Sequence, residues 1–424
     1  MPNPVRVLGV AASVGFLAML SLSPEAPAAK QRPAGPEKLA AMLARYDAMS
    51  PGDARESFAR EIDKFAGQRY ATTSRLYWHT TLEDAKAAAA AQHQPILHLR
   101  MLGRLDEDLS CANSRFFRTT LYANVETSKF LRDNFVLYWS SERAVPRVTI
   151  DFGDGRKLER TTTGNSAHYV MDERGNVLDV LPGLYAPVVF RSELQKSVKL
   201  AKAIQQLADS EVLGAVLAFH ETELRTSQTT FAGMAGTDYV RRRGRLIGAA
   251  EIGTAAVERA QRSTYAKMAV EVVDLQKIGI AAGKIDRGDV AQWATIGQKA
   301  WDIGLTPTNA PTRLRRADEP APMLLDAQSI ALIEKMRDGN PLAMKSGSLL
   351  ARLEQNILAD SALNQFQLRP QIRYQLMTRD SLDFATLNAT IYATVFHTPK
   401  DDPWIGLLDQ TDFTGLLADG VVLP

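Results

Sequence analysis

The sequence has very little cysteine, because Cys111 is the only one among 424 residues. An internal disulfide is therefore excluded, and a chain of this length can bury a core large enough to fold without one. A lone cysteine is buried and inert, or reactive, or paired with another molecule. Long apolar runs are also scarce. After Val7–Leu22 no segment has the length of a membrane-spanning helix.

Neither sign of charge predominates in this sequence. The 50 Lys and Arg residues and 48 Asp and Glu residues give a formal net charge of +2, so nucleic acid is not an expected partner. The motifs of several large enzyme classes are absent, namely the Walker phosphate loop, Gly-x-Ser-x-Gly and His-Glu-x-x-His. We therefore expect no cofactor.

The first residues have the three-part pattern of a secretory signal peptide. Arg6 precedes the uncharged run Val7–Leu22, and Ser23–Ala28 then ends in an Ala-x-Ala pattern. We expect a signal peptide over residues 1–29, cleaved near Ala28 or Ala29, and a periplasmic or secreted protein. The alternative is an uncleaved anchor, although the run is short for a spanning helix of about 20 residues. Membrane contact is expected only through this segment before cleavage.

Hydrophobic periodicity divides the rest of the chain into three parts. Residues 30–70 predict an N-terminal helical arm, with helices over Pro36–Met49 and Ala54–Gly67. Residues 71–208 predict a mixed α/β domain, because short β-patterned runs alternate with helical ones. Its expected strands are Leu76–Trp78, Pro95–Met101, Phe135–Ser140 and two hairpins over Arg147–Thr161 and Ala167–Leu181; its helices are Leu82–Gln92, Val125–Asn134 and Pro187–Leu207.

From residue 209 to 424 strand patterns nearly vanish, which predicts an all-α domain. A Pro-rich, charged stretch near residues 305–323 indicates a linker within it. The basic run Arg241–Arg245 is more simply a solvated loop or helix end than an anion site, since the chain has no wider basic field. The expected helices are Asp209–Arg225, Gly248–Val273, Val290–Trp301, Asp326–Arg337, Gly347–Leu358, Ser361–Met377 and Ser381–Phe396.

The segment Gln94–Arg118 combines a strand, an acidic loop and a helix start, with Cys111 at the turn into the helix. With the elements that follow, His79–Leu194 resembles a thioredoxin-like domain of the exported bacterial type. In that family a Cys-x-x-Cys motif begins this helix, and Cys111–Ser114 matches it with Ser114 in place of the second thiol. The family's cis-proline position falls at Ser166, and its tryptophan position at Ser110.

Three segments also resemble a group of exported bacterial proteins whose resemblance implies no mechanism: Ser110–Arg118, Thr163–Tyr169 and Asp402–Leu407. The expected fold class is therefore a thioredoxin-like α/β domain, with a mixed sheet and flanking helices, plus a C-terminal all-α domain.

The position of Cys111 leaves two chemical interpretations open. A thiolate at a helix N-terminus is stabilised by backbone N–H groups, and Arg115 and Arg118 add positive potential. The preceding acids Asp106–Asp108 oppose ionisation. Without a second thiol the protein cannot be a simple dithiol reductase, but a lone thiolate can form mixed disulfides. The other interpretation is a buried structural cysteine.

The resemblance implies a site on the face around Cys111. Its candidate catalytic residues are Cys111 and Ser114, and its candidate binding residues are Asn113, Arg115, Asn165, Ser166 and His168. His98 is better explained as a satisfied core histidine. Cys111 with His98 or His168 falls short of the three or four ligands of a metal site, so none is expected.

Two functions follow from these observations. The first is a binding or scaffold role in the cell envelope, with an exported protein or peptide as the partner at the Cys111 face. The alternative is a monothiol thiol-disulfide oxidoreductase or isomerase with Cys111 as nucleophile.

Overall fold

The structure is a computed structural model that describes residues 35–161, 165–235, 287–305, 324–338, 340, 346–404 and 416–423. The expected signal peptide, the basic run Arg241–Arg245, the helix Gly248–Val273 and most of the linker near 305–323 lie outside these ranges. Within them, no helix combines the length and the apolar character needed to cross a bilayer.

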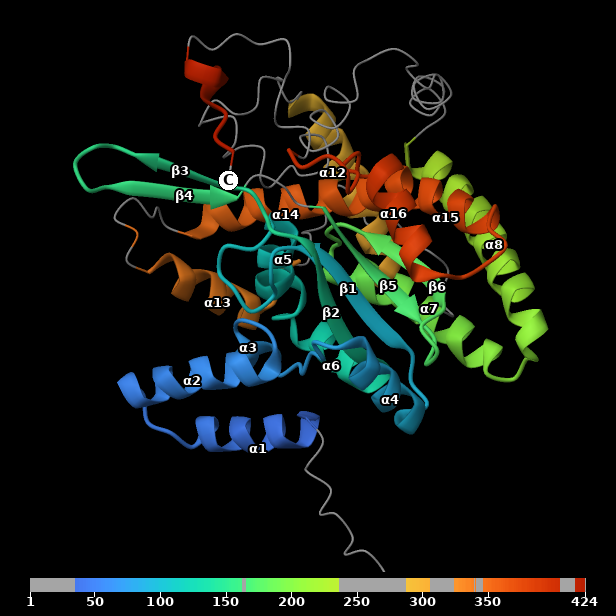
Figure 1. Ribbon diagram of the computed structural model, residues 1–424, viewed down its shortest axis with the longest axis horizontal. Coiled ribbons are helices and arrows are strands. Elements are labelled where there is room, and N and C mark those ends of the chain that lie inside the picture. The colour runs from blue at the N-terminus through green and yellow to red at the C-terminus, as the bar shows by residue number, and fades with distance from the viewer. Residues whose placement is uncertain are drawn as a thin grey trace, which may run out of the picture. The chain divides into compact units, whose positions relative to one another are not determined.

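A four-stranded mixed sheet lies at the centre of the described residues (Figure 1). Its order is β2-β1-β5-β6; β1 and β2 are parallel, and the other neighbours are antiparallel. This confirms the expected mixed sheet. Every residue of β5 and β6 is buried, as expected for strands covered on both faces. The strands are β1 (Ile96–Leu102), β2 (Val136–Arg143), β5 (Ser166–Met171) and β6 (Val177–Pro182).

Three of the helices around this sheet begin where the sequence predicts. They are α4 (Leu82–Gln92), α6 (Val125–Asn134) and α7 (Pro187–Ile204). The Thr81 side chain caps α4 by accepting from the Asp84 N–H, and Asn124 caps α6 in the same way. Helix α4 packs on β1 and β2, whereas α7 packs on β6 and α6.

The chain after Cys111 forms a short helix, α5 (Ala112–Phe116), which continues into the π-helical turn η1 (Phe117–Leu121). The Tyr122 N–H donates to the Phe117 carbonyl five residues back, at 2.6 Å, and so forms the wide turn. The helix start at Cys111 is therefore confirmed. The π-turn has no counterpart in the sequence prediction, because apolar periodicity does not reveal one inserted residue.

The predicted N-terminal arm, residues 30–70, contains α1 (Gly35–Asp47) and α2 (Asp53–Ala66), and the short α3 (Ala71–Ser74) follows it. The predicted strand over Leu76–Trp78 is wrong. This segment is buried at Leu76 and Trp78, but only His79 forms a bridge, with Tyr138 of β2. The arm has a small core of its own, made of Leu39, Leu43, Phe58, Ile62, Ala66 and Ala71.

The first predicted hairpin forms a separate two-stranded sheet of β3 (Arg147–Asp151) and β4 (Lys157–Thr161). Its turn contains Gly153 and Gly155 with φ of 77° and 90°, a region that favours glycine. In Figure 1 this hairpin extends beyond the central sheet. Its side chains alternate between exposed and half-buried, so it contributes little to the main core.

The described residues from Asp209 onward are helical, as expected. The predicted single helix Ser361–Met377 is wrong, because Ser361 belongs to α14 and a π-helical turn, η2 (Asn364–Leu368), separates α14 from α15. These helices share one hydrophobic core with the sheet, so the boundary near residue 208 stays a prediction. They are α8 (Asp209–Ala235), α12 (Arg287–Leu305), α13 (Ala327–Arg337), α14 (Ser346–Leu363), α15 (Arg369–Met377) and α16 (Phe384–Thr394), with a 3₁₀ turn η3 (Leu417–Gly420).

Helix α16 covers one face of the sheet. Its Phe384 ring lies 4.7 Å from the His98 ring and 5.0 Å from the Tyr169 ring, measured between centroids. Its Asn388 accepts a hydrogen bond from the Tyr169 hydroxyl at 2.9 Å. Helix α16 therefore packs on β1 and β5, the strands next to the candidate site.

Candidate functional site

Cys111 occupies the N-cap position of α5, directly after the loop that leaves β1. Its N–H donates to the Leu102 carbonyl at 3.2 Å, and its own carbonyl accepts from the Ser114 hydroxyl at 2.9 Å. The residue is 0% exposed. The backbone therefore places Cys111 at a helix start while excluding its side chain from solvent.

The neutral polar side chains next to Cys111 are paired with one another. The Asn113 amide donates to the Ser166 hydroxyl at 2.9 Å, which joins α5 to β5. The Ser114 hydroxyl donates to that of Ser110. All of these side chains are buried. The structure thus brings Asn113 and Ser166 together, as the resemblance implies, but within the interior.

Asn165 lies under the C-terminal part of the chain. Its amide donates to the Thr398 hydroxyl at 2.8 Å, and its carbonyl accepts from the Tyr392 hydroxyl at 3.4 Å. Burial raises the pKa of Tyr392, and Cys111 is among the neighbours that add to the increase. The segment from α16 to Thr398 therefore occupies the face where a peptide was expected. Thr163 and Gly164, which precede Asn165, lie outside the described residues.

His168 is buried on the other side of the sheet from His98. Adjacent registers show why: His98 pairs with Tyr169, and His168 pairs with Leu99, so the two rings point to opposite faces. The His168 Nε2 lies 2.6 Å from the Tyr122 hydroxyl. Burial lowers the pKa of His168 to about 3. Such a weak base cannot hold a proton taken from a thiol with a pKa of about 8.5.

Arg115 and Arg118 donate hydrogen bonds to backbone carbonyls and to hydroxyl groups. Arg115 donates to the Thr161 hydroxyl at 3.1 Å. Arg118 is buried and donates to the carbonyls of Leu105, Glu107 and Asp108 and to the Ser110 hydroxyl. Burial lowers the pKa of Arg118 to about 10. Arg118 therefore holds the acidic loop in place, a role that the sequence did not reveal.

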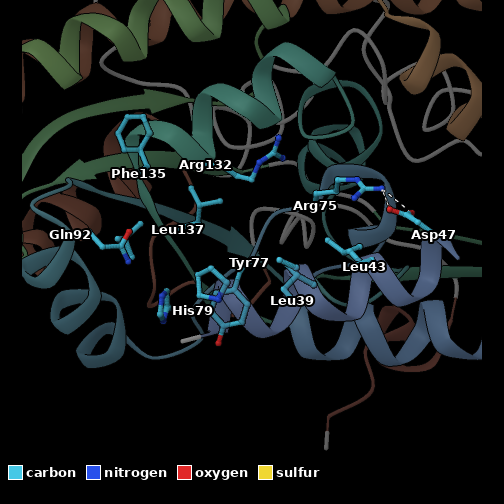
Figure 2. Close-up of a pocket in the computed structure, with 14 residues that line it drawn as sticks. Leu39, Leu43, Asp47, Arg75, Tyr77, His79, Gln92, Arg132, Phe135 and Leu137 are labelled. Atoms are coloured by element: carbon cyan, nitrogen blue, oxygen red, sulfur yellow. Dashed lines mark hydrogen bonds and ion pairs between the residues drawn. The ribbon is translucent and has the colours of Figure 1, made fainter. Parts of the chain in front are cut away.

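A pocket of about 420 Å³ lies away from Cys111, between α1 and the start of β2 (Figure 2). Sequence reasoning missed it, because its residues come from segments that carry no shared motif. Figure 2 shows the Arg75–Asp47 ion pair at one end, Gln92 at the other, and Tyr77 and Leu137 between them. This pocket is a second candidate binding site in the described residues.

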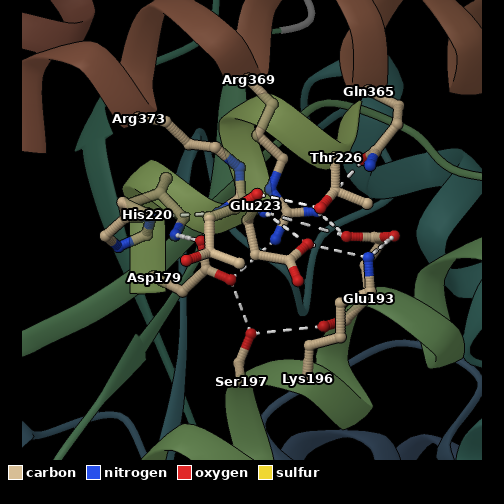
Figure 3. A network of polar contacts seen from close by, with 12 residues as sticks. Asp179, Glu193, Lys196, Ser197, His220, Glu223, Thr226, Gln365, Arg369 and Arg373 are labelled. Carbon is tan, nitrogen blue, oxygen red and sulfur yellow. Dashed lines mark hydrogen bonds and ion pairs between the residues drawn. The ribbon is translucent and has the colours of Figure 1, made fainter. Parts of the chain in front are cut away.

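A third group of polar side chains is a network of buried charges (Figure 3). Arg369 of α15 donates to Asp179 of β6 at 2.7 Å and to Glu193 of α7 at 2.6 Å, and both Arg369 and Asp179 are fully buried. Burial alone would raise the pKa of each acid. The nearby guanidinium groups overcome this effect, holding the pKa of Glu193 at about 2 and that of Asp179 lower still.

The network continues to α8. Arg373 contacts the His220 Nδ1 at 3.1 Å, and the His220 Nε2–H donates to the Leu178 carbonyl at 2.9 Å. Lys196 lies 2.9 Å from Glu193 and 2.9 Å from Glu223. Three acids thus face three bases around a neutral histidine, which ties β6, α7, α8 and α15 together. Asp179 and Arg369 are 190 positions apart, so no local pattern could have predicted their contact.

Comparison with known proteins adds no assignment. No protein-family model, curated protein or solved structure matches the chain. In the part of the chain that the structure describes, no group of three or more His, Cys, Asp or Glu side chains could hold a metal ion. Inference about function therefore rests on the geometry above.

Proposed function

We propose that this chain is an exported thioredoxin-like protein with a binding or scaffold role in the cell envelope, in which Cys111 is a structural residue. The sheet order β2-β1-β5-β6, with β1 and β2 parallel, supports the thioredoxin-like part. So does the position of Cys111 at the start of the helix after β1. The signal-peptide pattern of the first residues supports export.

One observation carries the proposal: the protein's own C-terminal segment closes the Cys111 face. Thiol-disulfide exchange requires a thiolate to reach a sulfur of the partner disulfide, and reactive cysteines are at least partly exposed. Cys111 is 0% exposed, and Asn165, which directly precedes Ser166 in the chain, is hydrogen-bonded to Thr398 and Tyr392. The thioredoxin-like part then acts as a scaffold that holds the C-terminal helices. A partner binds the surface that the scaffold and these helices form together.

The alternative function is monothiol exchange, which the position of Cys111 at a helix N-cap favours. The two functions differ in whether the folded protein accepts a disulfide. We would incubate folded wild type and Cys111→Ser with oxidised glutathione and measure adducts by intact-protein mass spectrometry. We expect no adduct on either folded protein, and an adduct on the wild type alone in denaturant. An adduct on folded wild type alone would establish the exchange function instead.

A further inference from the structure

The pocket between α1 and the start of β2 has one apolar side and one cationic side. Leu39 and Leu43 from α1 are buried and lie to the right of Tyr77 in the view of Figure 2, with Leu137 above Tyr77. Arg132 lies on the upper side of the same view. A volume of about 420 Å³ is within the range of pockets that bind small molecules, roughly 300–1,000 Å³.

The charges of the pocket leave positive potential unbalanced. Arg75 is paired with Asp47, at 2.7 and 2.9 Å to its two carboxylate oxygens. Arg132 donates to the Ser74 carbonyl at 2.9 Å, and in the described residues no carboxylate lies within ion-pair distance of it. A guanidinium has five N–H donors, so Arg132 has donors left for a ligand.

Arg75 and Arg132 are also close enough to affect each other. Partial burial, with the positive charge of Arg75, lowers the pKa of Arg132 despite the neighbouring Asp133. Two other titratable groups line the pocket: burial lowers the pKa of His79, which is neutral at pH 7, and burial raises the pKa of Tyr77. A ligand with a negative charge therefore relieves the repulsion between two guanidinium groups, whereas a cation adds to it.

We propose that this pocket binds a small organic carboxylate with an apolar body, such as a medium-chain fatty acid. Its carboxylate is held by Arg132 at the cationic side, and its hydrocarbon body lies against Leu39, Leu43 and Leu137. Arginine binds carboxylates through two parallel charge-assisted hydrogen bonds, which fix the orientation of the ligand as well as its charge. None of the pocket residues belongs to the Cys111 face, so the proposal is independent of the function above.

The test compares octanoate with 1-octanol, which has the same chain length and no charge, by titration calorimetry on the whole chain. We expect octanoate to bind the wild type at least about tenfold more tightly than 1-octanol, since hydrogen bonds to charged groups are the stronger class. Arg132→Gln should reduce octanoate affinity by about tenfold or more and leave 1-octanol affinity within about twofold.

Two further variants control this result. Arg60→Gln removes the same charge from an exposed position of α2 outside the pocket lining, and we expect wild-type octanoate affinity. Ala40→Trp adds bulk to an exposed lining residue without removing a hydrogen bond, and we expect it to abolish binding of both ligands. Equal affinity for octanoate and 1-octanol, equal effects of the two arginine variants, binding to Ala40→Trp, or no octanoate binding to the wild type would each overturn the proposal.

Discussion

The C-terminal helices meet the sheet at two buried polar regions of opposite character. Near Cys111 the contact between Asn165 and Thr398 is neutral, made by an amide and a hydroxyl group. Around Arg369 the contacts are ionic, with two carboxylates on one guanidinium. Both regions are buried, but of the two only the region around Arg369 pairs carboxylates with cations; the buried Arg118 near Cys111 donates to carbonyls and to the Ser110 hydroxyl.

The difference has consequences for stability. A neutral hydrogen bond contributes about 1 kcal/mol net, whereas removing one partner of a buried ion pair costs about 3–5 kcal/mol. The ionic region therefore fixes where α15 lies relative to β6 and α7. The segment from α16 onward is held on the sheet by charged groups of β2 as well, because Asn388 donates to Glu142 at 2.9 Å and Arg143 donates to the carbonyls of Pro399 and Asp402.

Among variants that test the difference between the two regions, Arg369→Met should have the largest effect on stability. The variant leaves Asp179 and Glu193 buried near one another with only part of their positive neighbours, and we expect a loss of about 3–5 kcal/mol of unfolding free energy. Denaturant unfolding followed by circular dichroism measures it. The control is Arg225→Gln, which removes an exposed ion pair with Glu221 and should cost less than about 0.5 kcal/mol. Equal losses would show that the network does not fix the helices.

Acid should weaken the ionic region through His220. Burial lowers its pKa to about 4 in the folded protein, below the usual value of 6.5, so the unfolded chain binds the extra proton first. Stability is complete above pH 6.5 and falls as the pH drops toward 4. Glu193, with a folded pKa of about 2, contributes further loss only below its usual value of 4.5. The loss thus begins well above the carboxylate range.

We expect the wild type to lose on the order of 2 kcal/mol between pH 7 and 4.5 from His220 alone. Urea unfolding of wild type and His220→Gln at a series of pH values measures this contribution. The unfolding free energy of the variant should decrease less over the same pH range. Part of the decrease should remain in the variant, because burial also lowers the pKa of His168, to about 3. Parallel curves for the two proteins would contradict a neutral, buried His220.

Local features of the fold could be predicted from the sequence. The starts of the helices at Leu82 and Val125 could be predicted because Thr81 and Asn124 precede them, and the capping bond joins residues only three apart. The hairpin over Arg147–Thr161 could be predicted because Gly153 and Gly155 suit the backbone of its turn, which favours glycine. The strand at Leu76–Trp78 was wrong because apolar residues of a strand and of a buried connecting segment look alike.

The candidate site was predictable only in part. Cys111 does begin a helix, and Asn113 does meet Ser166, but whether they bind a partner stays a prediction. The cover over the face could not be predicted, since Asn165 and Thr398 are 233 positions apart. The ion pairs of Arg369 with Asp179 and Glu193, which span 190 and 176 positions, could not be predicted for the same reason. The sequence shows which groups exist, and only packing shows which of them are accessible.

The most direct test of the account is the alkylation rate of Cys111 in the folded protein. Because reaction requires the cover to open, we predict that iodoacetamide modifies Cys111 at least about 10³-fold more slowly than in denaturant. Asn165→Ala removes one neutral bond from the cover and should raise the native rate by about tenfold or less, corresponding to about 1 kcal/mol. Native alkylation as fast as in denaturant, or a reaction midpoint well below pH 8.5, would contradict a closed, structural Cys111.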